Sequence, residues 1–138
     1  MQTCGQVEAI ACEVVNKFLQ QMVGRGASNV TAMLTPDVLL VHLRDVLTTV
    51  ELTLANTTSE DGRSADSVVR AIRDQLVRRS RAQLARRLAE AIGRQPMAVL
   101  HDVEPTTGEE ILVFTFAARL DVSMGSQASR RSPRQGSA

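Results

Sequence analysis

The chain has 138 residues, of which 43% are hydrophobic and 22% charged, and its net charge at pH 7 is +1. This length supports one domain with a core that needs no disulfides, and the balanced charge excludes an overall attraction to nucleic acid or membranes. No apolar run approaches the ~18 residues of a transmembrane helix and the N-terminus lacks a signal-peptide pattern, so we expect a cytoplasmic protein.

Residues 6–23 are predicted to form an amphipathic helix. Its apolar side chains recur at steps of three and four residues and therefore share one helical face: Val7, Ile10, Ala11, Val14, Val15, Phe18 and Met22. Gly24-Arg25-Gly26 follows as a stop signal, because glycine adopts the left-handed C-cap conformation without a steric penalty. We expect the apolar face to pack on a sheet.

Residues 28–47 change to a period of two, which predicts a β-hairpin. Val30, Ala32 and Leu34 alternate with their neighbours in the way expected of a strand that buries one face. Thr35-Pro36-Asp37 is a turn sequence, since Pro presets φ and Asp bonds nearby backbone. The run from Val38 to Leu43 is almost wholly apolar, as in a central strand.

The chain turns from strand to helix at Thr48. The Thr48 hydroxyl and Glu51, three positions later, have the spacing of a capping box, in which each side chain bonds the other residue's backbone amide. A short helix is expected from Thr49 to about Asn56. We interpret Thr48 and Glu51 as a structural cap; the alternative for Glu51 is a catalytic carboxylate.

Residues 65–93 are helical in pattern, with Ser64 as the expected N-cap. Val68, Val69, Ile72 and Leu76 form one apolar sector, and a later set forms another: Leu84, Ala85, Leu88, Ala91 and Ile92. The two sectors differ by roughly 150° around a straight helix. We therefore predict a break or sharp kink near residues 78–81, giving two helices.

A second hairpin and a tail complete the chain. Met97–Val103 and Glu110–Ala117 are apolar runs joined by a loop with turn residues. Residues 121–138 are predicted to be a disordered basic tail after a single domain at residues 1–120. The fold class is α+β: a four-stranded antiparallel sheet from two hairpins with helices packed on one face, in the order α-β-β-α-α-α-β-β.

Several short motifs resemble the MpsC-like domain, a bacterial family named for a Na⁺-translocating, membrane-potential-generating system. The matching segments are Gly24-Arg25-Gly26, Leu47-Thr48-x-x-Glu51-x-x-Leu54, Ile92-Gly93-Arg94, Val99-x-x-Asp102-Val103-x-Pro105 and Val113-Phe114. The resemblance covers residues 6–117 and departs at Ala27, where the family commonly has Pro. It implies an accessory role beside a membrane system.

The arginines of the long helical region are the candidate contacts for an anion or a partner. They are Arg70, Arg73, Arg78, Arg79, Arg81, Arg86 and Arg87. Such a run binds phosphate, nucleic acid or an acidic partner in some proteins, whereas a solvated helix face with local ion pairs is the ordinary explanation. The chain lacks Trp and Tyr, which argues against a platform that stacks bases.

Other polar groups do not form a recognisable catalytic or metal-binding set. His42 and His101 lie in predicted strands and would approach each other only if those strands were neighbours. Two histidines without a third ligand do not define a zinc site. An acidic edge near the second hairpin, formed by Asp102, Glu104, Glu109 and Glu110, matches no calcium loop. We expect no catalytic residue, cofactor or metal.

The sequence thus favours a non-enzymatic accessory or regulatory interaction module. We expect a homodimer, because a small sheet with free edges gains from pairing or cover. A protein partner at or near a membrane system follows from the family resemblance. The alternative is nucleic-acid or phosphate-ligand binding through the Arg-rich helices at residues 66–92.

Overall fold

The computed structural model describes residues 2–57 and 65–122, so Ser64 and residues 123–138 of the predicted tail lie outside the described residues. The described residues form three helices and four strands, in the order α-β-β-α-α-β-β. They are α1 (Cys4–Val23), β1 (Asn29–Thr35), β2 (Val38–Arg44), α2 (Thr49–Ala55), α3 (Asp66–Ile92), β3 (Ala98–Glu104) and β4 (Glu109–Thr115).

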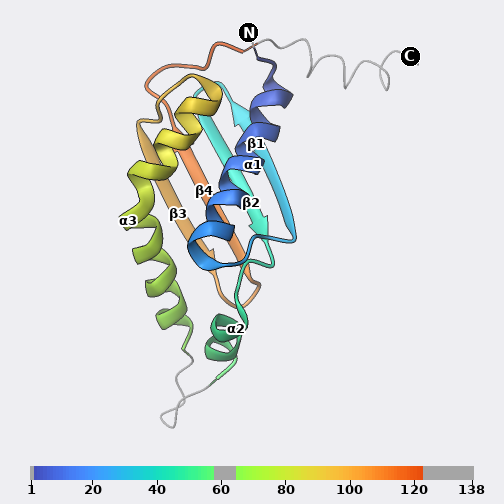
Figure 1. Ribbon diagram of the computed structural model, residues 1–138, viewed down its shortest axis with the longest axis vertical. Helices are drawn as coiled ribbons and strands as arrows, with labels where there is room; N and C mark the ends of the chain where they lie inside the picture. The colour runs from blue at the N-terminus through green and yellow to red at the C-terminus, as the bar shows by residue number, and fades with distance from the viewer. Residues whose placement is uncertain (1, 58–64, 123–138) are drawn as a thin grey trace, which may run out of the picture.

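The strands form one antiparallel sheet in the order β1-β2-β4-β3, so the two hairpins meet through β2 and β4. Helices α1 and α3 lie over the same face of this sheet, and α2 sits at one end of it (Figure 1). The predicted α+β class and the four-stranded antiparallel sheet are confirmed.

The core lies between this sheet face and the two long helices. Burial alternates along β2, where Leu39, Val41 and Leu43 are fully buried and their neighbours are not. Phe114 on β4 is the cross-strand partner of Leu39 and is equally buried. The period-two pattern therefore identifies the inner face of the sheet directly.

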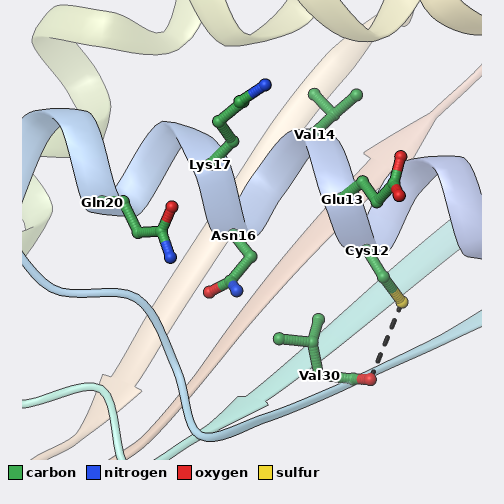
Figure 2. Close-up of a pocket in the computed structure, with 7 residues that line it drawn as sticks. All are labelled: Cys12, Glu13, Val14, Asn16, Lys17, Gln20 and Val30. Carbon is green, nitrogen blue, oxygen red and sulfur yellow. Dashed lines mark hydrogen bonds between the residues drawn. The ribbon is translucent and has the colours of Figure 1, made fainter.

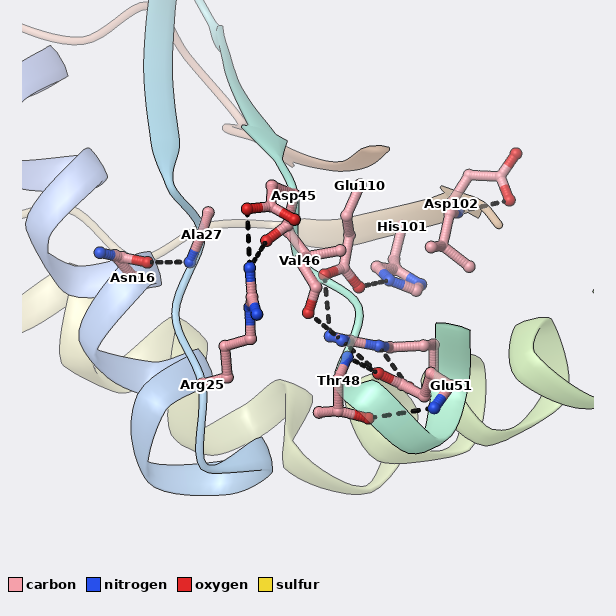
Figure 3. A network of polar contacts seen from close by, with 12 residues as sticks. Asn16, Arg25, Ala27, Asp45, Val46, Thr48, Glu51, His101, Asp102 and Glu110 are labelled. Carbon is pink, nitrogen blue, oxygen red and sulfur yellow. Dashed lines mark hydrogen bonds and ion pairs between the residues drawn. The ribbon is translucent and has the colours of Figure 1, made fainter. Parts of the chain in front are cut away.

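The Gly24-Arg25-Gly26 segment follows α1 and contacts the residue that follows β2. Gly24 takes the left-handed C-cap conformation with φ of 87°. The Arg25 guanidinium pairs with the Asp45 carboxylate at 2.7 Å. A Cβ on Gly26 would lie 2.6 Å from Oδ1 of Asn16, the atom that accepts the Ala27 amide (Figure 3). Both glycines of the motif are therefore explained by the fold, Gly24 by its backbone conformation and Gly26 by the lack of space for a side chain.

The predicted break in the long helical region is wrong, because α3 runs without interruption from Asp66 to Ile92. Its buried stripe includes Val69, Arg73 and Val77 and continues past the predicted break through Ser80 to Leu84 and Leu88. Val68 and Ile72, assigned to the apolar sector from the sequence, are 46% and 48% exposed. One uninterrupted helix accommodates both halves because Arg73 occupies the inner face.

Candidate functional site

A buried ionic cluster lies where α2, α3 and the sheet meet. Its members are Arg73 on α3, Glu51 on α2, Glu110 on β4 and His101 on β3. Arg73 and Glu110 are each 1% exposed and Glu51 is 6% exposed. Figure 3 shows Glu51, Glu110 and His101 converging with Val46, which follows β2. Four elements and a connecting segment are thus joined at one point.

The Arg73 guanidinium makes a forked contact with Glu51. Its Nε lies 2.8 Å from Oε2 of Glu51 and its Nη2 lies 2.7 Å from Oε1. Nη1 donates to Oε1 of Glu110 at 3.2 Å, and Nη2 also donates to the Val46 carbonyl. A guanidinium that satisfies two carboxylates and a carbonyl tolerates burial that an unpaired one would not.

Glu51 serves both the cap of α2 and the ionic cluster. Oε1 of Glu51 accepts the Thr48 amide at 2.9 Å, and the Thr48 hydroxyl accepts the Glu51 amide at 3.2 Å. Burial alone would raise the pKa of Glu51, but the hydrogen bonds and charge of Arg73, with the bonds from Thr48, outweigh it and hold the pKa below its ordinary value. The capping box therefore also presents a carboxylate to Arg73.

Replacing Thr48 with alanine should lower the free energy of unfolding by about 1 kcal/mol and leave binding activity intact. The reason is that the hydroxyl caps one amide of α2, while the Arg73 contacts to Glu51 need no atom of Thr48. Chemical denaturation measures the effect. Thr49→Ala, at the neighbouring exposed position, is the control and should not destabilise. A stable Thr48→Ala protein that loses binding would contradict the structural role.

The depressed pKa of Glu51 predicts acid sensitivity. Its contribution to stability is fully present above the ordinary pKa of 4.5 and is lost as pH falls through the lower folded-state pKa. Glu51→Gln should cost about 2 kcal/mol at neutral pH, and its difference from the wild type should shrink below pH 4.5. Urea titrations at stepped pH measure this, with exposed Glu90→Gln as control. A difference that stays constant with pH would contradict the prediction.

His101 completes the cluster from β3. Its Nε2 is bonded to Oε2 of Glu110, and its side chain is 4% exposed. The other ring nitrogen, Nδ1, has no hydrogen-bond partner among the described residues. A shallow hollow adjoins the ring, where Arg70 and Asp102 are already paired with each other at 3.3 Å. One imidazole nitrogen beside a neutralised ion pair does not make a metal centre.

The two histidines are kept apart by the sheet. Strand β4 separates β2, which carries His42, from β3, which carries His101. The alternation of burial places His101 on the inner face and His42 on the opposite face, where it pairs with Glu109 at 2.7 Å. Within residues 2–57 and 65–122, no three His, Cys, Asp or Glu side chains are grouped closely enough to hold a metal ion.

The predicted acidic edge is divided between both faces of the sheet. Glu110 points inward to Arg73, while Asp102 and Glu104 both pair with Arg70, at 3.3 Å and 2.9 Å. The pKa of Glu104 is lowered, mainly by hydrogen bonds from Thr106 and further by Arg70. These carboxylates are matched by nearby cations and donors within the fold.

The candidate arginines are not brought together on one surface. Arg73 is buried, Arg70 binds the β3 carboxylates, and Arg78 pairs with Asp74 at 2.7 Å. Arg87 donates to Gln21 on α1. Arg79, Arg81 and Arg86 are exposed and make no such contact with the residues that the structure describes. Anion binding through them stays a prediction, and an absence of retention on heparin at low salt would contradict it.

A separate hollow lies between α1 and the outer edge of β1 (Figure 2). Cys12 lies in its wall, and its thiol donates to the Val30 carbonyl at 3.8 Å. Burial raises the pKa of the Cys12 thiol, and the negative charge of Glu8 acts in the same direction. The thiol is therefore protonated at neutral pH, which is the opposite of what a nucleophilic cysteine requires.

One comparison with known proteins identifies the family. Residues 3–118 match the family described as Na⁺-translocating membrane potential-generating system (MpsC). The chain belongs to the MpsC family. Neither curated proteins nor solved structures gave a significant match. The matched range contains the whole MpsC fold described above, including the ionic cluster and the Gly24-Arg25-Gly26 segment.

The MpsC family name refers to a membrane system. None of the helices α1, α2 and α3 combines the length and the apolar character that a membrane span requires.

Proposed function

We propose that this MpsC protein is a non-enzymatic accessory or regulatory component that works by binding other proteins, in association with the Na⁺-translocating system that names its family. The observation that carries the proposal is the internal pairing of the ionic cluster. Arg73 and Glu110 are turned into the fold and matched there, so their charge stabilises the packing of α2 and α3 instead of meeting a substrate.

We further propose that the accessory component is a homodimer. A row of four apolar side chains, Met33, Leu40, Val113 and Leu100, crosses the sheet face away from the helices and supports self-association. Sedimentation velocity of the full chain over a concentration series measures this directly. The expected result is a reversible shift from monomer to dimer, and a monomer at the highest concentration that the protein tolerates would contradict it.

The accessory role itself is tested by sodium flux. Vesicles that contain the membrane components of the system should transport Na⁺ at a rate that changes when the chain is added. Vesicles without those components, given the same chain, are the control and should show no change. Two results together would contradict the role. The Na⁺ flux would be identical with and without the chain, and the purified chain would not bind the vesicles that contain the membrane components.

A further inference from the structure

The face of the sheet opposite α1 and α3 carries an apolar row across its full width. Met33 pairs with Leu40, Leu40 with Val113, and Val113 with Leu100, so the row runs from β1 to β3 without a polar interruption. Met33 is 62% exposed and Leu100 is 56% exposed at its two ends. Leu40 and Val113 between them are half-buried, so the row is most open at its two ends. Apolar side chains left exposed together in this way are typical of a contact surface.

Charged side chains occupy one end of the same face and are divided by sign between its halves. Arg44, at the end of β2, points to this face because its neighbour Leu43 is buried on the other. Glu109 on β4 and Glu104 on β3 are cross-strand partners and point the same way. The half that contains β2 therefore carries the basic Arg44, and the half that contains β3 and β4 is the acidic half, although Glu109 also pairs with His42 and Glu104 with Arg70 within the same chain.

The edge of β1 is a poorer site for self-association. Its Leu34 amide already donates to Oε2 of Glu8 on α1 at 2.9 Å. The thiols of Cys4 and Cys12 donate to the Leu34 and Val30 carbonyls, at 3.9 Å and 3.8 Å. A strand added at this edge would have to displace these α1 side chains, so β1 is blocked in the manner that natural sheets use against edge pairing.

We infer that a second copy of this chain packs on the open face of the sheet, with a two-fold axis parallel to the strands; this rests on the self-association proposed above. That axis exchanges β2 with β4 and β1 with β3. It places Leu40 over Val113 of the second copy and Met33 over Leu100 of the second copy. It also brings Arg44 of each copy to the acidic half of the other, beside Glu109.

The size of the face suits a reversible dimer. Four strands of seven residues span roughly 19 by 24 Å at ordinary strand spacings. Two such faces therefore cover about 900 Å² before the relief of the side chains is counted, which is below the roughly 1,200 Å² where standard interfaces begin and in the range of weak, transient ones. Sheets packed in this way lie about 10 Å apart with their strands nearly aligned.

Charge reversal tests the pairing of the two halves. Arg44→Glu and Glu109→Arg should each weaken homodimerisation about tenfold or more, because like charges then face each other across the interface. An equimolar mixture of the two variants should form heterodimers, since each reversed residue meets its opposite on the other copy. Native mass spectrometry of differently tagged chains measures this, and circular dichroism verifies that each variant is folded.

Charge placed in the apolar row tests the face itself. Leu100→Glu should abolish the dimer in sedimentation velocity. The matched control is Val50→Glu on α2, which is 69% exposed and lies away from this face, and it should leave the dimer unchanged.

The outcomes separate the inference from the proposed function. A wild-type chain that never dimerises overturns the proposed homodimer and this inference together. A dimer that survives Leu100→Glu overturns the open face alone and leaves the homodimer standing. A mixture of the reversed variants that forms no more dimer than either variant by itself overturns the two-fold arrangement. Loss of the dimer in Leu100→Glu with heterodimers in the mixture is the expected result.

Discussion

Replacing Arg73 with methionine should lower the free energy of unfolding by about 3–5 kcal/mol, because Glu51 and Glu110 would stay buried without their counter-charge. Both carboxylates contact the guanidinium directly, and both are buried. Methionine keeps the length and helix propensity of the side chain, so the loss reports on charge and hydrogen bonding. Urea unfolding followed by circular dichroism measures it, since the chain has no Trp or Tyr for fluorescence.

Arg79→Met is the matched control for this experiment. Arg79 lies on the same helix and is exposed, so the same substitution should change stability by no more than about 0.5 kcal/mol. Equal losses in the two variants would contradict a special role for Arg73 and would assign the effect to the helix.

Glu110→Leu should cost about 3 kcal/mol. The substitution leaves Arg73 with Glu51 as its remaining carboxylate and removes the partner of Nε2 of His101. Glu109→Leu, one residue away on the open face, is the control. Glu109 pairs at the surface with His42, so its loss should be no more than about 1 kcal/mol.

The double variant Arg73→Met/Glu110→Leu provides a sharper test of the cluster. Its loss of unfolding free energy should be smaller than the sum of the two single losses by about 1–3 kcal/mol. The reason is that the double variant removes both charges, so neither of the two remains buried without the other. Denaturation of all four proteins under one buffer gives the coupling energy. Strictly additive losses would show that the two residues act independently, which contradicts the network.

The local features of the fold were readable from the sequence because short-range rules decide them. The turn at Thr35-Pro36-Asp37 and the period-two runs on either side predicted the first hairpin, and the structure contains it. Thr48 and Glu51 have capping-box spacing, and both bonds of that box are present. Each of these depends on residues a few positions apart.

The ionic cluster was missed because its members are far apart in sequence. Arg73 meets Glu51 across 22 positions and Glu110 across 37. When these partners are unknown, an arginine is expected on the solvent-exposed face of a helix. With Arg73 placed there, the predicted apolar face of α3 included Val68 and Ile72. The one usable signal was the spacing of Val69, Arg73 and Val77, which places the arginine in line with two core valines.

The position of the histidines depended on strand order, which the sequence did not specify. Two hairpins can join through several pairs of strands, and the pairing of β2 with β4 separates His42 from His101. The blocked edge of β1 was equally hidden, since it requires Glu8 to reach Leu34 across the gap between helix and sheet.

Arg73 also restricts how α3 can dock on the sheet. The other large members of its buried stripe are apolar, among them Val69, Val77, Leu84 and Leu88, and they would pack almost as well after a slide of one turn, ~5.4 Å. Such a slide would take the guanidinium away from Glu51 and Glu110 and leave it unpaired in the core. We therefore expect α2, α3 and the β3–β4 hairpin to open as one cooperative unit, with amide protons that exchange at a common rate.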